Sequence, residues 1–150
     1  MKKQKVMVAL KNIESVSSLL DLACRVARGM EAELIALHVV EMPDALDLSA
    51  EAAVLDQPGK EVLARAHEAA CKEHEQISMQ LIRARDAAKT IVSEAKEQHI
   101  DLVILGYHPR NPLADILLGS TAQYVARHAP CWVVVEIPAL SNSRGIGAGA

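Results

Sequence analysis

The stretch Asp101-Leu-Val-Ile-Leu-Gly-Tyr-His-Pro-Arg-Asn-Pro-Leu-Ala-Asp-Ile-Leu-Leu-Gly-Ser120 decides the fold. Its residues 102–105 form a continuous apolar run of strand length, which is typical of a strand buried on both faces. Gly106 ends this run, and a loop with two prolines follows. We therefore expect a central strand that ends at Gly106 and is followed by a site loop. Asp101, at the other end of this strand, is interpreted as structural rather than catalytic.

A helix follows the loop and begins at Gly119 and Ser120. Ser120 is a good N-cap residue, and Gln123 three residues later completes a capping-box pattern. The first backbone N–H groups of a helix are free, and its dipole is positive at this end. Strand, loop and helix N-terminus together therefore predict a natural seat for phosphate.

Strands alternate with helices along the rest of the chain. Apolar runs predict strands over residues 6–10, 34–40, 77–84, 102–105 and 131–137. Residues that cap or break helices predict the helix bounds: Asn12 and Gly29 for the first helix, Asp56 and Pro58 for the start of the second, Asp86 for the third, and Pro130 for the end of the last. This alternation predicts an α/β domain with a parallel sheet and helices on both faces.

The length and composition restrict the class of protein. A chain of 150 residues fits one domain, which we place at residues 1–140, with a flexible tail over 141–150. The net charge of −3 and the 2% aromatic content argue against nucleic-acid binding. No apolar run is long enough to cross a membrane, so we expect a soluble, cytoplasmic protein without membrane insertion. The three cysteines suit reduced thiols.

Several motifs resemble the universal stress protein family. Gly106-Tyr-His-Pro109, followed after nine residues by Gly119-Ser120, resembles the family signature Gly-x2-Gly-x9-Gly-Ser/Thr. Arg127-His-Ala-Pro-Cys131 with Val133-Val-Val135 resembles its last helix-to-strand junction, and His38-Val-Val-Glu41 the end of its second strand. The resemblance extends from Lys5 to about Ile137.

This resemblance implies a Rossmann-like, adenine nucleotide alpha hydrolase-like fold with strand order 3-2-1-4-5. It also implies a site for ATP or AMP, with or without Mg, at the carboxyl ends of the strands where the order reverses. The candidate nucleotide-binding residues are Leu10, Lys11, Val39, Val40, Gly106, His108, Pro109, Arg110, Gly119, Ser120 and Thr121.

Two departures from the family pattern leave two functions open. Lys11-Asn12-Ile13 stands where ATP-binding members have Asp-Gly-Ser or a close variant, so a cation replaces an acid. Pro109 stands at the second glycine of the signature and has no N–H to donate to phosphate. The chain is either a sensor that binds an adenine nucleotide or a related anion, or a stress-protein module that binds no nucleotide.

The second function is one of protein contact. The Lys-Asn variant resembles stress-protein domains appended to permeases and antiporters, which implies a module that regulates a membrane transporter, either as a stand-alone relative or as an excised domain. The last strand is apolar and β-branched, and family members dimerise through it. We predict a homodimer through Val133, Val135 and Ile137, because an unprotected edge strand pairs readily with a copy of itself.

Catalysis and metal binding have weaker support. No pattern fixes Asn111 or Asp115 beside a phosphate, and a lone loop histidine such as His108 is more often solvated, so we predict no enzyme apart from weak nucleotide hydrolysis. His67, Cys71 and His74 share one helix face and have the chemistry of zinc ligands, but a fourth ligand is missing. A solvent-facing histidine pair beside a packed cysteine is the favoured interpretation.

Overall fold

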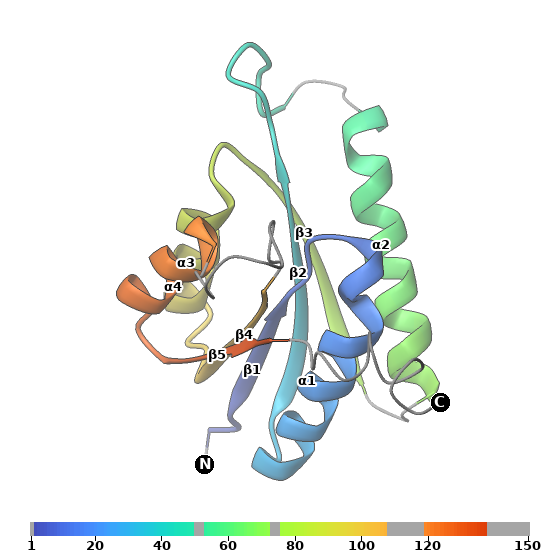
Figure 1. Ribbon diagram of the computed structural model, residues 1–150, viewed down its shortest axis with the longest axis vertical. Coiled ribbons are helices and arrows are strands. Elements are labelled where there is room, and N and C mark those ends of the chain that lie inside the picture. The colour runs from blue at the N-terminus through green and yellow to red at the C-terminus, as the bar shows by residue number, and fades with distance from the viewer. Residues whose placement is uncertain (1, 50–52, 73–75, 108–118, 138–150) are drawn as a thin grey trace, which may run out of the picture.

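A five-stranded parallel sheet with strand order β3-β2-β1-β4-β5 forms the centre of the molecule (Figure 1). The computed structural model describes residues 2–49, 53–72, 76–107 and 119–137. The strands are β1 (Lys5–Ala9), β2 (Glu33–Glu41), β3 (Ile77–Ala84), β4 (Leu102–Gly106) and β5 (Trp132–Glu136). The predicted fold class and strand order are therefore confirmed.

Helices cover both faces of the sheet (Figure 1). On one face lie α1 (Val16–Met30), which follows the short 3-10 helix η1 (Ile13–Ser15), and α2 (Ala53–Lys72). On the other face lie α3 (Ala87–Glu97) and α4 (Ser120–His128). Each pair of helices packs on its own hydrophobic cluster, and the central strands contribute side chains to both. Met7 and Val103 face α3 and α4, whereas Val8 and Ile104 face α1 and α2.

The register of the sheet brings the carboxyl ends of three strands to the same end of the sheet. Ala9 pairs with Leu37 of β2 on one side and with Leu105 of β4 on the other. The carboxyl ends of β1, β2 and β4 therefore lie close together, and the order of strands reverses between β1 and β4. This is the place where open α/β sheets form a crevice between the helices of the two faces.

Asp101 lies at the amino end of the sheet and has a structural role. Its carboxylate accepts a hydrogen bond from the backbone N–H of Lys5 at 2.8 Å, and its own N–H donates to the Lys5 carbonyl at 2.9 Å. Its carbonyl in turn accepts from the N–H of Trp132 at 3.3 Å. Asp101 thus joins the beginnings of β1, β4 and β5.

Three predicted helix bounds are wrong. The N-cap of α4 is Gly119 and not Ser120, because the backbone is still extended at Gly119 and the helix starts one residue later. Gly29 lies inside α1, which ends at Met30 with Glu31 as the left-handed cap. The second helix begins at Ala53 rather than at Asp56 and Pro58, so its proline lies inside the helix and leaves one helical hydrogen bond unmade.

Within the described ranges, no helix is long and apolar enough to cross a membrane. The predicted tail over residues 141–150 lies outside those ranges. The predicted flexible stretch from Pro43 to Gly59 includes the first turns of α2. Two arginines at and just after the end of β3 hold the loop before α2. Arg83 donates to the carbonyl of Leu48 at 3.3 Å, and Arg85 donates to the carbonyl of Pro43.

Candidate functional site

The chain leaves the end of β1 through Leu10, Lys11 and Asn12. Leu10 is buried and Lys11 is exposed, so the ammonium group of Lys11 is available at the carboxyl end of the sheet. The side-chain oxygen of Asn12 is buried, and no described residue donates a hydrogen bond to it. Asn12 precedes η1, as predicted for a cap, but its side chain makes no cap hydrogen bond. A buried oxygen without a donor is unfavourable, and a ligand hydroxyl or amino group would satisfy it.

The end of β2 supplies Val39 and Val40 beside this turn. The two side chains point to opposite faces of the sheet, as neighbours in a strand do. Val39 is half-buried and packs with the cluster under α3 and α4, whereas Val40 is buried. Val39 therefore provides an apolar surface near the point where the strand order reverses.

The N-cap residue of α4 is Gly119, which has no side chain to bond the first turn of the helix. Its backbone is extended, with φ −62° and ψ 161°. Among the described residues, the N–H of Gln123 is the first to close a helical bond, to the carbonyl of Gly119 at 2.9 Å. With Gly119 as the N-cap, Gln123 is the fourth residue of the helix and not the third, as the predicted capping box requires. The N–H groups of Ser120, Thr121 and Ala122 precede this bond. Together with the helix dipole they form the kind of terminus that binds anions.

Gly119 does not pack closely against any described residue. A Cβ built at this position would meet no described atom within 4 Å, and its φ suits any residue. The packing of the described residues therefore does not require glycine here. A close approach of another molecule to the backbone is an alternative reason for a glycine at this position.

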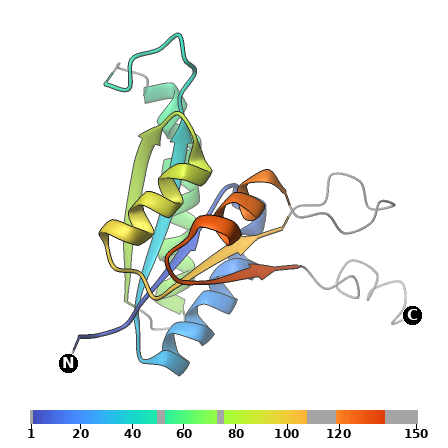
Figure 2. The same cartoon turned by 90° about the vertical axis from the view of Figure 1, so that its left-hand side faces the viewer.

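The structure brings the described candidates to one end of the sheet. Leu10, Lys11, Val39, Val40 and Gly106 follow or end adjacent strands, and α4 starts at the end at which β4 finishes (Figure 2). The predicted site residues His108, Pro109 and Arg110, and the loop residues Asn111 and Asp115, lie outside the described ranges.

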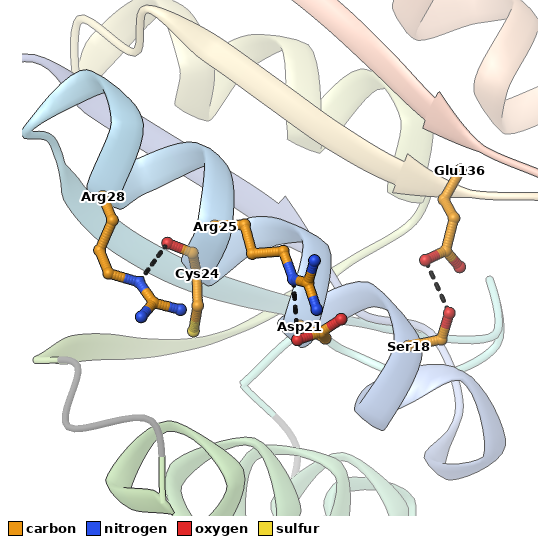
Figure 3. Close-up of polar contacts among 6 residues, drawn as sticks. All are labelled: Ser18, Asp21, Cys24, Arg25, Arg28 and Glu136. Atoms are coloured by element: carbon orange, nitrogen blue, oxygen red, sulfur yellow. Dashed lines mark hydrogen bonds and ion pairs between the residues drawn. The ribbon is translucent and has the colours of Figure 1, made fainter.

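Glu136, a residue that sequence reasoning missed, ties the end of β5 to α1. Its carboxylate accepts a hydrogen bond of 2.7 Å from the hydroxyl of Ser18, as Figure 3 shows. Its carbonyl accepts from the N–H of Tyr107, at the end of β4, at 3.0 Å. The two bonds hold the ends of β4 and β5 beside the start of α1. No local pattern marks this pair, because its members lie 118 residues apart in the chain.

The remaining polar candidates have structural explanations. His67 is exposed, the side chain of Cys71 is not among those described, and His74 lies outside the described ranges. The described residues therefore do not test whether these three residues bind a metal ion together. Among the described residues, no group of three His, Cys, Asp or Glu is placed to hold a metal ion. Burial and the nearby Asp101 carboxylate raise the pKa of the Cys131 thiol, which keeps it protonated and unreactive.

A hollow at the amino end of the sheet also has a structural explanation. Lys2, Lys3, Arg28 and Glu31 contribute its charged groups. The C-terminus of α1 lies here, and the negative end of its helix dipole favours cations. The lysines and the arginine therefore complement the end of the helix, and the same dipole opposes an anion at this position.

The fold and the edge described above define a Rossmann-like α/β domain with a candidate anion site at the point where the strand order reverses. Residues 3–136 match the universal stress protein family, and the chain belongs to that family. It is 29% identical over 136 residues to universal stress protein A homolog 2 of Coxiella burnetii, covering 87% of this chain and 92% of the relative. It is 29% identical over 119 residues to universal stress protein MJ0531 of Methanocaldococcus jannaschii, covering 75% and 69%.

Solved structures agree with this assignment. A universal stress protein family member from Burkholderia pseudomallei has a TM-score of 0.70 at 27% identity, covering 91% of this chain and 96% of that one. A universal stress protein in complex with cAMP has a TM-score of 0.73 at 23% identity, covering 91% and 98%. The universal stress protein of Archaeoglobus fulgidus in complex with dAMP has a TM-score of 0.71 at 20% identity, covering 90% and 98%.

Proposed function

We propose that this protein is a sensor that binds an adenine nucleotide, ATP or AMP, or a related anion at the carboxyl ends of β1, β2 and β4. The observation that carries the proposal is the N-terminus of α4, where the cap residue Gly119 has no side chain and an added Cβ would meet no described atom within 4 Å. A phosphate group placed there would receive N–H donors and the positive end of the helix dipole. Binding without turnover, rather than catalysis, is proposed.

The chemistry around this terminus favours an anion that also carries hydrogen-bond donors. The exposed Lys11 adds a positive charge at the edge, and the buried oxygen of Asn12 needs a donor. A nucleotide offers both phosphate and ribose hydroxyl groups, and Val39 offers an apolar contact for a base. Related structures in complex with dAMP and cAMP support this ligand class. Lys11 stands where ATP-binding members of the family have an acidic residue. The proposed site therefore favours contacts with the phosphate of the nucleotide over contacts with its adenosine.

The test is calorimetric titration with AMP and ATP, with and without magnesium. Co-purified nucleotide is first sought by denaturing the protein and recording its absorbance. We expect wild-type protein to bind with a dissociation constant on the order of micromolar, and Gly119→Val to lose binding by about a hundredfold or more, because the added side chain fills the space next to the helix terminus.

The matched control is Gly29→Val in α1. A Cβ at Gly29 also meets no described atom within 4 Å, and this position lies near the C-terminus of its helix, far from the proposed site. Gly29→Val should bind like the wild type. If the wild type has a clean absorbance spectrum and binds neither nucleotide, the sensor proposal is wrong.

A second function is favoured by the exposed edge of β5. Trp132, at the start of β5, is 71% exposed, and Ile137, directly after this strand, is 49% exposed. We propose, as the alternative, a stress-protein module that acts through dimerisation and contact with a protein partner, with a membrane transporter as the partner class indicated by the Lys11-Asn12 pattern. Retention of a folded dimer in protein that binds no nucleotide would favour this alternative.

A further inference from the structure

A buried histidine lies next to the proposed site, and the proposed function does not use it. His38 in β2 is 9% exposed, and its Nδ1 lies 2.8 Å from the carbonyl oxygen of Leu10. A carbonyl oxygen can only accept, so Nδ1 must carry the hydrogen and donate it. In the neutral ring Nε2 is then an acceptor. The partner of this hydrogen bond is the last residue before the turn that carries Lys11 and Asn12.

Leu10 is held by β2 through both of its backbone groups. Its N–H donates to the carbonyl of Leu37 at 2.9 Å, and its carbonyl accepts from the ring of His38. β1 itself ends at Ala9, so these two bonds extend the attachment of the chain by one residue beyond the strand. The direction in which the chain leaves the sheet is therefore fixed partly by a side chain and not by the strand ladder alone.

The ring of His38 is also confined from the side of α2. A Cβ at Gly59 would lie 2.5 Å from Cδ2 and 3.0 Å from Nε2 of His38, and 2.8 Å from a methyl carbon of Leu81. Glycine is unfavourable inside a helix, so its presence in α2 is explained by this close approach. The backbone of α2 at Gly59 thus limits the positions open to the ring, which bonds the carbonyl of Leu10.

We infer that His38 is a positioning residue for the proposed site. Its ring, packed against Gly59, holds the carbonyl of Leu10 and thereby places Lys11 and Asn12 at the point where the strand order reverses. The inference rests on the proposed function for the identity of the site, but the hydrogen bond and the packing that it describes do not depend on a ligand. Asn12, whose buried side-chain oxygen has no donor among the described residues, lies two residues after the carbonyl that this bond holds.

Two substitutions at His38 separate the hydrogen bond from the packing. His38→Leu keeps an apolar group of useful size but removes the donor. His38→Asn is smaller, yet its side-chain N–H can donate from near the position of Nδ1. Amide hydrogen exchange at Leu10 is measured by NMR and divided by exchange at Met7, in the middle of the same strand. We expect this ratio to rise about tenfold in His38→Leu and to return to within about threefold of the wild type in His38→Asn.

Ile91→Ala in α3 is the control for a general loss of stability, because Ile91 is buried under the opposite face of the sheet. It should speed exchange at Met7 and Leu10 together and leave their ratio unchanged. Gly59→Ala is a second test if His38→Leu does not fold. Its methyl group would displace the ring while keeping the imidazole, so it should raise the Leu10 ratio as His38→Leu does.

The affinity for AMP is then compared across the same proteins. We expect His38→Leu to weaken binding by about tenfold and His38→Asn to restore it, which a purely structural role would not produce. Unchanged Leu10 exchange in His38→Leu and Gly59→Ala would overturn the inference. So would faster exchange with undiminished AMP affinity. If wild-type protein binds no AMP, the proposed function fails, and the exchange ratio alone decides whether His38 positions the turn.

Discussion

Asp56 in α2 and Arg83 in β3 form a largely buried ion pair. The guanidinium donates to the carboxylate twice, with Nε–Oδ1 at 3.0 Å and Nη2–Oδ2 at 2.5 Å. This hydrogen bonding holds the pKa of Asp56 below its ordinary value of 3.8 and raises that of Arg83. A single carboxylate therefore joins the first turns of α2 to the edge strand β3, whereas the sequence pattern alone predicts a helix start at Asp56.

The stability that Asp56 contributes should depend on pH in a defined direction. Because its pKa is lower in the folded than in the unfolded protein, the contribution is fully present above about pH 4 and is lost as the pH falls through the lowered value. Asp56→Asn should lower the thermal unfolding midpoint at pH 7, and its difference from the wild type should shrink below pH 4. Asp21→Asn, in the exposed pair with Arg25, should have little effect at any pH. A difference for Asp56→Asn that stays constant from pH 7 to pH 2 would contradict this origin.

The two helices on one face of the sheet begin in different ways. Asp86 caps α3, because its carboxylate accepts a hydrogen bond from the N–H of Lys89 at 3.1 Å. The N-cap of α4 is Gly119, which has no side chain to bond the helix. Where a side chain of the protein accepts from the first N–H groups of a helix, that helix start has a structural role. Where no such cap is present, the same N–H groups can donate to a ligand.

Substitution at the two helix starts should therefore differ in cost. Asp86→Ala should lower the free energy of unfolding by about 1 kcal/mol, because an N–H of α3 loses its acceptor. Asp86→Ser should recover most of this. Ser120→Ala should change stability by less than about 0.5 kcal/mol, because Ser120 is the first residue of the helix and not its N-cap. Chemical denaturation of the variants measures all three values. A loss at Ser120 as large as at Asp86 would restore the capping box that the sequence predicted.

These elements also show how far the sequence could predict the molecule. Local signals were sufficient for the apolar run of β4 and for the cap at Asp86, and the family resemblance supplied the strand order. They failed where neighbouring structure decides. The helix α1 continues past Gly29 to Met30, so the residue that ends it in the left-handed conformation is Glu31, with φ 53°, and not Gly29. The partners of Glu136 and of His38 could not be predicted either, since each bond requires the folded sheet to bring its groups together.

At the scale of the whole molecule, β5 leaves one side of the sheet open. The carbonyl of Glu136 and the N–H of Trp132 bond towards β4. Because backbone groups alternate along a strand, those of Val133, Val135 and Ile137 point away from β4, and β5 is the last strand in the sheet order. These are the residues predicted for the dimer. The exposed side chain of Trp132 lies on the same strand.

Val135→Pro should separate a dimer formed through this edge into monomers. Proline removes the outward N–H of residue 135 and is tolerated on edge strands, whereas the inward bonds of Trp132 and Glu136 to the β4 side are kept. Sedimentation velocity at about 50 µM, a concentration at which a moderately stable dimer is populated, should give a dimeric mass for the wild type and a monomeric mass for the variant. Ser18→Ala, which removes the hydroxyl bonded to Glu136 without touching the edge, should stay dimeric. A monomeric wild type would exclude this interface, and a dimeric Val135→Pro would place the contact on another surface of the protein.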